Sequence, residues 1–281
     1  MARGVGISRA VRLRQGGHEH LKAVLRDEVP YIAVERAPQN GTPKPGPTSV
    51  FDVATYNVHR WTGLTGGRRW MPELALEVIR EMDADVMAIQ EALRPFGARD
   101  PLMQIADELG YYLTFVSTRV HRVGELGNAI LSRWPMSSVY TIDLSLSRLE
   151  RRSAAVALFD GSSSPVAVAS THLALVDRTR KRQVQSLLES ENLQGPAILL
   201  GDMNAWRRCP ATRTLDETFR SMHHNLDWPA TFPSTRPVLA LDRIYTRGAH
   251  VVSMQAHNTA AARRASDHLP VMARIELEAE R

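Results

Sequence analysis

The chain of 281 residues carries a formal net charge of +5, with 43% hydrophobic and 23% charged residues. This composition is typical of a globular protein that is long enough to bury its own core, and it excludes a disordered or fibrous chain. The single cysteine, Cys209, excludes an intrachain disulfide, and no segment approaches the ~18 consecutive apolar residues of a membrane-spanning helix. The basic N-terminus also lacks the apolar segment of a secretory signal, so we expect a cytoplasmic protein.

Residues 1–50 are predicted to form a basic extension that ends in an irregular linker. They hold eight Lys or Arg against four Asp or Glu, whereas the rest of the chain holds 27 against 26. The segment 37–49 is rich in proline and glycine, which favours an irregular strap, and a short helix is weakly indicated around residues 20–26. We therefore expect a single catalytic domain over residues 51–281.

From Phe51 onward the chain alternates between strand and helix patterns. Strands are predicted at 51–58, 85–90, 112–117, 127–133, 153–159, 165–171, 196–202, 240–246, 251–257 and 269–277. A helix is predicted over 72–82, where apolar residues recur with helical spacing, and another is predicted to begin near Asp177. About ten strands with three or four helices predict two stacked sheets flanked by helices, an α/β (α+β) fold.

Polar side chains stand at the ends of several predicted strands, where a buried core would not place them. The set is Asn57, Glu91, His172, Asp202, Asn204, Asp242, Asp267 and His268. Strand ends hold side chains rigidly at a common rim, which suits a catalytic site. Each residue alone has a structural alternative, such as a turn for Asn57, a helix cap for Glu91 or a core position for His172. The complete set in this order favours function.

The chemistry of the set indicates a divalent cation and a phosphate ester. Carboxylate oxygens from Glu91, Asp202 and Asp267, with amide oxygens from Asn57 and Asn204, are the donors that Mg²⁺ or Mn²⁺ prefers. No Cys/His spacing indicates zinc. A cation neutralises phosphoryl oxygens, while a histidine or carboxylate prepares the attacking water. We therefore predict a phosphoester hydrolase with Mg²⁺ or Mn²⁺ as its cofactor.

Seven segments carry a resemblance to a known family. They are TYNVHRW (55–61), DVMAIQE (85–91), GNAILSRWP (127–135), STHL (170–173), LLGDMNA (199–205), TFPS with LDRIY (231–245) and SDHLPV (266–271). In this order the chain resembles the endonuclease/exonuclease/phosphatase superfamily, and within it a deoxyribonuclease-like, compact bacterial type of member. The resemblance implies a four-layer αββα sandwich, in which two mixed sheets lie between helices and the active site lies at one end.

The resemblance also implies roles for the metal-binding and water-positioning residues. Asn57 and Glu91 would bind the principal metal ion, with Asp267 close to it. Asp202 and Asn204 would position the attacking water and the scissile phosphate. Either one metal ion or two would fit these motifs.

The same resemblance implies roles for the two histidines. His268 would act as a general base or as an acid on the phosphate side, and His172 would contact the phosphate. Asp242 would orient one of these histidines. The LDRIY segment favours His172 as its partner, and His268 is the alternative.

Arginines crowd the loops that carry these motifs, which favours a nucleic acid substrate. The basic residues are Arg60, Arg68, Arg69, Arg151, Arg152, Arg178, Arg180, Lys181, Arg182, Arg207, Arg208, Arg263 and Arg264. Loops that share one rim would surround the site with positive charge, the electrostatic footprint of a polyanion binder, although arginines also simply solvate exposed loops. We expect Asn128, Arg152 and Arg180 to contact the substrate and Trp206 to stack on a base.

Two other functions are compatible with the motifs. The first is a phosphomonoesterase or phospholipase-C-like enzyme on a lipid or inositol headgroup, with the basic N-terminal arm on anionic membrane, but the sequence shows no hydrophobic hairpin for this purpose. The second is a non-catalytic scaffold, which retention of the whole polar set disfavours. Our expectation is a metal-dependent endonuclease-type phosphodiesterase that acts as a monomer on nucleic acid, without a stable protein partner.

Overall fold

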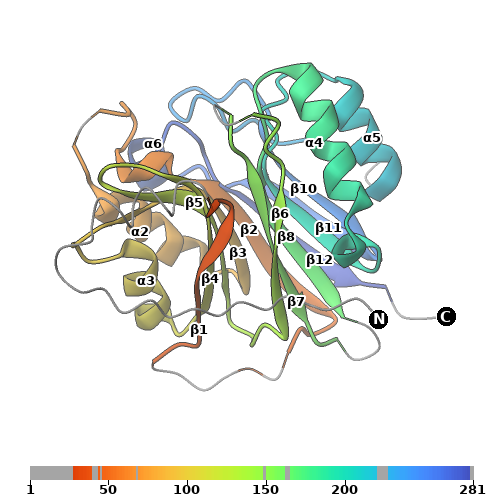
Figure 1. The fold of residues 1–281 in the computed structure, drawn as a ribbon, viewed down its shortest axis with the longest axis horizontal. Coiled ribbons are helices and arrows are strands. Elements are labelled where there is room, and N and C mark those ends of the chain that lie inside the picture. The colour runs from red at the N-terminus through yellow and green to blue at the C-terminus, as the bar shows by residue number, and fades with distance from the viewer. Residues whose placement is uncertain are drawn as a thin grey trace.

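The chain builds two stacked β-sheets, as the strand patterns predict (Figure 1). The computed structural model describes residues 28–39, 44, 46–67, 69–147, 150–161, 165–219 and 227–278. One sheet has the order β1-β4-β5-β3-β2-β12-β11 and the other has the order β10-β9-β8-β7-β6. The first sheet contains β1 (Tyr31–Arg36), β2 (Val50–Asn57), β3 (Val86–Pro95), β4 (Tyr112–Val120), β5 (Gly124–Ser132), β11 (Ala249–Ala256) and β12 (Val271–Leu277). The second contains β6 (Ser138–Asp143), β7 (Ser153–Phe159), β8 (Val166–His172), β9 (Ala197–Asp202) and β10 (Asp242–Arg247).

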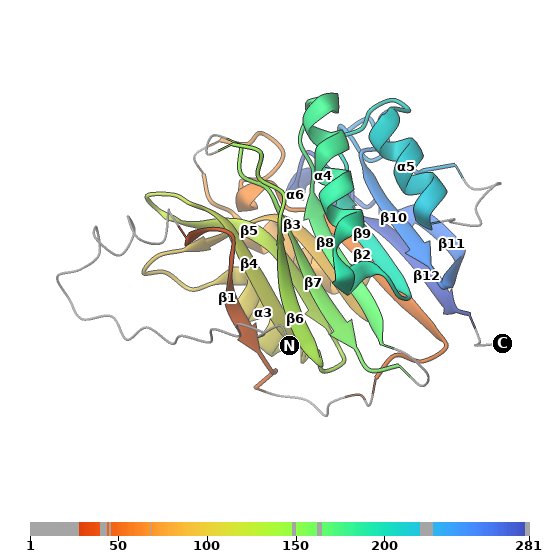
Figure 2. The same ribbon diagram turned by 45° about the vertical axis from the view of Figure 1, so that its right-hand side comes forward.

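Helices cover the outer face of each sheet, which gives four layers (Figure 2). The helices α2 (Pro72–Met82), α3 (Pro101–Leu109) and α6 (Ala260–Ala265) pack on the seven-stranded sheet, and α4 (Asp177–Glu189) and α5 (Pro210–Phe219) pack on the five-stranded sheet. Alternate residues along a strand face opposite sides of its sheet. Accordingly, Val53 of β2 belongs to the core between the sheets, and its neighbour Ala54 belongs to the core under α2. The predicted αββα sandwich is confirmed.

Each sheet contains one parallel pair of strands, and these pairs position the site. Strand β2 runs parallel to β3, and β8 runs parallel to β9, whereas the other paired neighbours are antiparallel. The carboxyl ends of parallel strands lie at the same edge of a sheet. The register therefore sets Asn57 opposite Gln90 in one sheet and His172 opposite Asp202 in the other.

Several elements differ from the sequence-based expectation. The predicted helix over 72–82 matches α2, but β1, β6, α3, α5 and α6 were not expected. Both β1 and β6 are edge strands of mainly partly buried residues, so they lack the apolar runs of central strands. Because Tyr31–Arg36 pairs with β4, the folded sheet begins before the boundary expected at residue 50. The helix indicated around residues 20–26 lies outside the described residues.

Candidate active site

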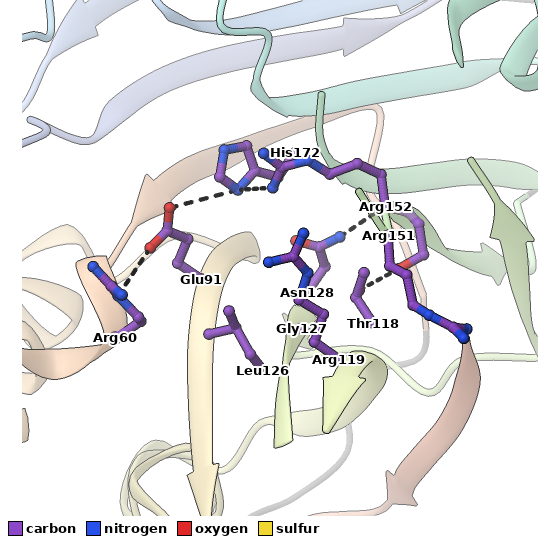
Figure 3. Close-up of a pocket in the computed structure, with 11 residues that line it drawn as sticks. Arg60, Glu91, Thr118, Arg119, Leu126, Gly127, Asn128, Arg151, Arg152 and His172 are labelled. Carbon is purple, nitrogen blue, oxygen red and sulfur yellow. Dashed lines mark hydrogen bonds and ion pairs between the residues drawn. The ribbon is translucent and has the colours of Figure 1, made fainter. Parts of the chain in front are cut away.

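Glu91 projects into the site from an irregularity in β3. The pairing of β3 with β5 shifts register between Ile89 and Ala92, and Glu91 adopts a left-handed backbone with a φ of 51°. Such a bulge re-aims one side chain out of the regular alternation. The Glu91 carboxylate lies 3.5 Å from Arg60 Nε and 3.8 Å from His172 Nδ1 (Figure 3). No described residue donates a hydrogen bond to this carboxylate at closer range, so its oxygens are available to a ligand.

A tight turn after β9 presents Asp202 and Asn204 at the strand end. Gly201 permits the close approach of β9 to β8, because a Cβ at this position would lie 1.9 Å from the Thr171 carbonyl oxygen. Asn204 has a φ of 50°, and its backbone N–H donates to Asp202 Oδ1 at 2.8 Å. Asparagine tolerates this backbone better than most residues. The backbone geometry of this turn therefore favours Gly201 and Asn204, and the chemistry of the site uses Asp202 and Asn204.

Asp202 contacts polar side chains from both sheets. Asn57 Nδ2, from the seven-stranded sheet, donates to Asp202 Oδ2 at 3.1 Å. The same oxygen lies 3.3 Å from His172 Nε2 and 3.8 Å from His268 Nε2. Burial raises the pKa of Asp202 to about 7, against the opposing effects of His268 and of hydrogen bonds from Asn204 and Asn57. Four predicted site residues therefore contact one buried carboxyl group.

Asp242 pairs with His268, so the expected pairing of Asp242 with His172 is wrong. His268 Nδ1 donates to Asp242 Oδ2 at 2.8 Å, and Thr231 Oγ1 donates to the same oxygen at 2.6 Å. The reason lies in the strand order β10-β9-β8, because β9 separates Asp242 on β10 from His172 on β8. Burial alone would lower the pKa of His268, but Asp242 and Asp202 overcome this effect and raise it to about 10. In the metal-free protein His268 is therefore protonated at neutral pH.

His172 has the opposite electrostatic environment. Its Nε2 accepts a hydrogen bond from Asn204 Nδ2 at 2.9 Å, and its Nδ1 lies 3.4 Å from Arg152 NH1. Burial lowers the pKa of His172 well below its usual range, and the positive charge of Arg152 adds to this effect. The site thus holds one neutral and one protonated histidine, an arrangement that suits two different roles on one substrate.

Asp267 joins the site through the turn before β12. Its Oδ1 lies 3.2 Å from His59 Nδ1 and 3.4 Å from Ser266 Oγ. Ser266 Oγ donates its proton to the carbonyl oxygen of Asn57 at 2.7 Å, which ties this turn to the end of β2. The structure therefore brings all eight predicted catalytic and metal-binding residues to one edge of the sandwich.

The donor set fits a hard divalent cation. Asp202, Asp242 and His268 each place one ligand-capable atom within 4.8 Å of the others. A protonated imidazole offers no lone pair, however, so this group is a poor cation site while His268 keeps its proton. Glu91 and Asp267, with the Asn57 amide, supply oxygens of the kind that Mg²⁺ and Mn²⁺ bind, and Glu91 has no competing hydrogen bond among the described residues. Glu91, Asp267 and Asn57 therefore fit a divalent cation better than Asp202, Asp242 and His268 do.

A pocket of about 210 Å³ opens beside Glu91 and His172 (Figure 3). It is lined by Arg60, Glu91, Thr118, Arg119, Leu126, Gly127, Asn128, Arg151, Arg152, Ser153 and His172. Asn128 and Arg152, both expected to contact substrate, are in this lining. Trp206 is 58% exposed on the loop after Asn204, and the Arg207 guanidinium lies 5.0 Å from its ring centre. Substrate contact by Asn128, Arg152 and Trp206 stays a prediction.

Arg180 cannot contact substrate as expected, because its side chain is fully buried in α4. Its guanidinium donates to the carbonyl oxygens of Ala174, Leu175 and Asn204 at 2.7, 3.2 and 2.6 Å, and it pairs with Asp177. Arg180 therefore ties the loop after β8 to the loop after β9. Its sequence neighbours Lys181 and Arg182 are exposed.

We expect Arg180→Gln to lower the free energy of unfolding by about 3–5 kcal/mol, the cost of breaking a buried charged network. The matched control is Lys181→Gln with Arg182→Gln, which removes charge from the exposed face and should change stability by less than about 1 kcal/mol. Urea unfolding followed by circular dichroism measures both. Equal stability of Arg180→Gln and the wild type would contradict the structural role.

Sequence reasoning missed four residues that support the site. They are His59, Arg119, Thr231 and Ser266. His59, Thr231 and Ser266 stand inside the motifs TYNVHRW, TFPS and SDHLPV. Their place within these motifs is the sequence feature that could have identified them as site residues. Arg119 stands in no motif, and only the antiparallel pairing of β4 with β5 brings it to the pocket.

Comparison with known proteins identifies the family. The model of the Endonuclease/Exonuclease/phosphatase family matches residues 72–268. The chain belongs to the endonuclease/exonuclease/phosphatase family. Members of this family hydrolyse phosphoester bonds and generally depend on divalent metal, and the acidic and histidine side chains described above could bind such an ion.

Similarity to other proteins extends over most of the chain. YbhP of Escherichia coli K12, an uncharacterized protein, is 30% identical over 251 residues, which cover 81% of this chain and 96% of YbhP. The human Nocturnin catalytic domain, solved with bound sulfate, is 21% identical with a TM-score of 0.64, covering 81% of this chain and 93% of that domain. TDP2 of D. rerio, solved with a single-strand DNA product, is 14% identical with a TM-score of 0.60, covering 82% and 100%. No helix in the described ranges is long and apolar enough to cross a membrane.

Proposed function

We propose that this chain is a divalent-metal-dependent phosphodiesterase that cuts nucleic acid as an endonuclease, with Mg²⁺ or Mn²⁺ as its cofactor. The observation that carries this proposal is the Glu91 carboxylate, which accepts no hydrogen bond from the described residues. It lines a pocket that also contains arginines, and it lies 3.8 Å from His172, which in turn contacts Asp202. Two proteins of this fold were solved with bound anions, Nocturnin with sulfate and TDP2 with a single-strand DNA product, which supports an anionic substrate.

Asn57, Glu91 and Asp267 would hold the cation. When bound, the ion would supply charge neutralisation at the phosphoryl oxygens and at the leaving oxygen. Asp202 faces the same space, and its elevated pKa near 7 makes it a suitable acceptor for the proton of an attacking water. Asn204 Nδ2, which already donates to His172 and to the Leu173 carbonyl oxygen, fixes the geometry of that turn.

His172 and His268 would have different roles at the phosphate. Protonated His268, held by Asp242, can donate to the charge that develops on the phosphate. Neutral His172, beside Arg152, can donate or accept a hydrogen bond at a phosphate oxygen without adding charge. This division follows from their opposite pKa shifts.

The first test of the proposal is metal dependence combined with Glu91→Gln. We expect no turnover of bis-p-nitrophenyl phosphate in EDTA, recovery with Mg²⁺ or Mn²⁺, and a loss of at least ~10²-fold in kcat/KM for Glu91→Gln. The control is Glu108→Gln, which removes an exposed carboxylate on α3 that pairs with Arg80 on α2, on the outer face of the seven-stranded sheet. Full turnover in EDTA, with metal absence verified by elemental analysis, would refute the proposal.

The second test concerns the substrate class, and it depends on salt. Arg178, Lys181, Arg182, Arg207 and Arg208 are exposed around the loops that follow β8 and β9. If three or four cations contact phosphates, log affinity for duplex DNA should fall against log salt with a slope near −3, because each contact contributes about −0.9. The double variant Lys181→Gln with Arg182→Gln should make this slope less negative. Arg213→Gln, on the surface of α5, should leave the slope unchanged. A slope near zero for DNA and RNA would exclude a nucleic acid rim.

One surface favours a second candidate, a phosphoesterase of lipid headgroups. Leu175, Val176 and Trp206 are 69%, 57% and 58% exposed, and they stand beside the basic residues of the same two loops. Apolar side chains ringed by Lys and Arg are typical of surfaces that dock on anionic membranes. Anionic phospholipid vesicles in the same activity panel distinguish the candidates, since a headgroup enzyme would turn over phospholipid faster than DNA or RNA.

A further inference from the structure

The most exposed apolar side chains of the described residues gather at the edge of the sandwich that holds the active site. The five large apolar side chains with the highest exposed fractions, 57–69%, all stand in loops: Val123, Leu175, Val176, Trp206 and Val238. These loops are the hairpin between β4 and β5, the loops after β8 and β9, and the segment before β10, which lie at the edge where β2 and β3 end. Single exposed apolar residues are ordinary, but this concentration at one edge indicates an interaction surface.

Two buried arginines hold three of these loops together. Arg180, on α4, donates to the backbone of the loop after β8 and also, at 2.6 Å, to the Asn204 carbonyl oxygen after β9. Arg243, on β10, donates to the carbonyl oxygens of Ala205 and Ala240 at 2.9 and 3.2 Å, which joins the loop after β9 to the segment before β10. The exposed side chains of the three loops therefore stand together on a fixed backbone. We call these side chains the rim patch: Leu175, Val176, Trp206 and Val238.

The loops that carry the rim patch contain positive charge only. Segments 173–176, 203–209 and 231–241 contain no Asp, Glu or Lys, and their arginines are Arg207, Arg208 and Arg236. All three of these arginines are exposed. Asp177, which begins α4 next to the patch, is already paired with two arginines. The surface is therefore apolar and basic, and its charge complements an anionic partner.

This combination fits an anionic membrane better than a protein or a nucleic acid. The core of a protein interface is depleted of charged residues, whereas here the Arg207 guanidinium lies 5.0 Å from the Trp206 ring centre. At a membrane surface, arginine can reach headgroup phosphates while its apolar neighbour enters the interface, a region in which tryptophan is enriched. Nucleobases stack on aromatic rings, but three of the four side chains in the patch are aliphatic.

We infer that the rim patch docks this protein on the surface of a membrane that contains anionic lipid. The inference goes beyond the proposed function, because it does not depend on which phosphate ester the site cuts. His172 and Asp202 end the two strands that lead into the loops after β8 and β9. Docking through these loops therefore turns the active-site edge toward the membrane.

Vesicle binding in EDTA tests the inference without metal or turnover. The full chain is mixed with vesicles of equal parts phosphatidylglycerol and phosphatidylcholine, or of phosphatidylcholine alone, and the bound protein is measured by flotation. Each Lys or Arg near an anionic surface strengthens binding about fivefold. We therefore expect the protein to bind the anionic vesicles at least ~10-fold more tightly than the neutral ones.

Matched apolar variants separate docking through the patch from attraction by charge alone. Leu175→Asn with Val238→Asn should weaken binding to the anionic vesicles by at least ~10-fold, because two aliphatic side chains then no longer enter the interface. Val252→Asn is the control. Val252 is 54% exposed within β11, outside the loops of the active-site edge, so its replacement should leave binding unchanged.

Charge and insertion each have a further variant. Arg207→Gln with Arg208→Gln should also weaken binding by at least ~10-fold, whereas Arg274→Gln, exposed on β12, should not. Trp206→Phe should keep the affinity within ~3-fold, because phenylalanine is also apolar and aromatic. The same variant should lose most of the quenching of tryptophan fluorescence by brominated lipid. Circular dichroism verifies that each variant is folded.

Three results would overturn the inference. The first is no binding of the wild type to anionic vesicles, and the second is binding that survives Leu175→Asn with Val238→Asn, since charge alone would then explain it. The third is a double variant that loses a single-stranded oligonucleotide, or dissociates a dimer in analytical ultracentrifugation, with vesicle binding intact. That result would assign the patch to nucleic acid or to a second copy of the chain.

The vesicle measurements also separate this inference from the proposed function. A protein that docks through the patch but cuts no phosphodiester with metal present would overturn the proposed function alone. A protein that cuts phosphodiesters but binds no vesicles would overturn only the membrane surface.

Discussion

Replacing His268 with alanine should lower kcat on a phosphodiester by about 10³-fold, within the range for loss of a general acid or a charge-stabilising group. Of His172 and His268, only His268 has an environment that keeps it protonated, because Asp242 accepts from Nδ1 at 2.8 Å and Asp202 lies 3.8 Å from Nε2. No other described cation is held between these two carboxylates. Steady-state kinetics with metal in excess measures the loss, and an unchanged circular dichroism spectrum shows that the fold is retained.

The pH profile separates a proton-donating role from a structural one. Asp242 is a positioning residue, and its carboxylate is one of the groups that raise the pKa of His268 to about 10. Asp242→Asn should therefore move the alkaline limb of kcat/KM to lower pH by more than about one unit, because His268 then loses its proton sooner. The control is Asp216→Asn, a carboxyl on α5 outside the site. A folded His268→Ala with wild-type kcat, or an alkaline limb that does not move, would contradict this role.

The core of the fold and the site chemistry could be predicted from the sequence because they depend on local patterns. Apolar runs such as PAILLGD form strands buried on both faces, and the polar residue that ends such a run must face the rim. The order of the motifs along the chain is enough to indicate the family, because it requires no knowledge of which residues are close in space. Helix α2 was predicted with its correct bounds, since Pro72 fixes its first turn and its apolar face repeats regularly.

The features that were missed or mistaken depend on contacts between distant segments. The partner of Asp242 is decided by the order of β10, β9 and β8, which local sequence does not encode. Arg180 looks like any other residue of a basic run, and only the convergence of the loops after β8 and β9 buries it. Strand β1 has the weak pattern of an edge strand and lies before a proline-rich segment. The sequence therefore does not predict its pairing with β4.

Asp202→Asn should abolish most activity and yet stabilise the metal-free protein at alkaline pH. Asp202 is the carboxyl group that Asn57, His172, His268 and the Asn204 backbone all approach, so its loss should lower kcat by at least ~10²-fold. Asparagine fills the same space and cannot accept the proton of an attacking water. The activity of Asn57→Ala should fall as well, because this change removes both a hydrogen-bond donor to Asp202 and an amide oxygen proposed to bind the cation.

The stability effect follows from the sign of the pKa shift of Asp202. Burial raises this pKa from 3.8 to about 7, so between these values the folded protein binds more protons than the unfolded chain. The free energy of unfolding of the wild type therefore falls as pH rises through that window, and it stays lower above pH 7. The neutral amide of Asp202→Asn does not ionise, so between about pH 5 and about pH 8 the variant should gain roughly 2 kcal/mol relative to the wild type. Urea unfolding of both proteins in EDTA at the two pH values measures this gain, because the charge of a bound cation then does not contribute. A variant that loses stability relative to the wild type as pH rises would show that Asp202 is ionised at little cost, and that its partners stabilise the carboxylate rather than the acid.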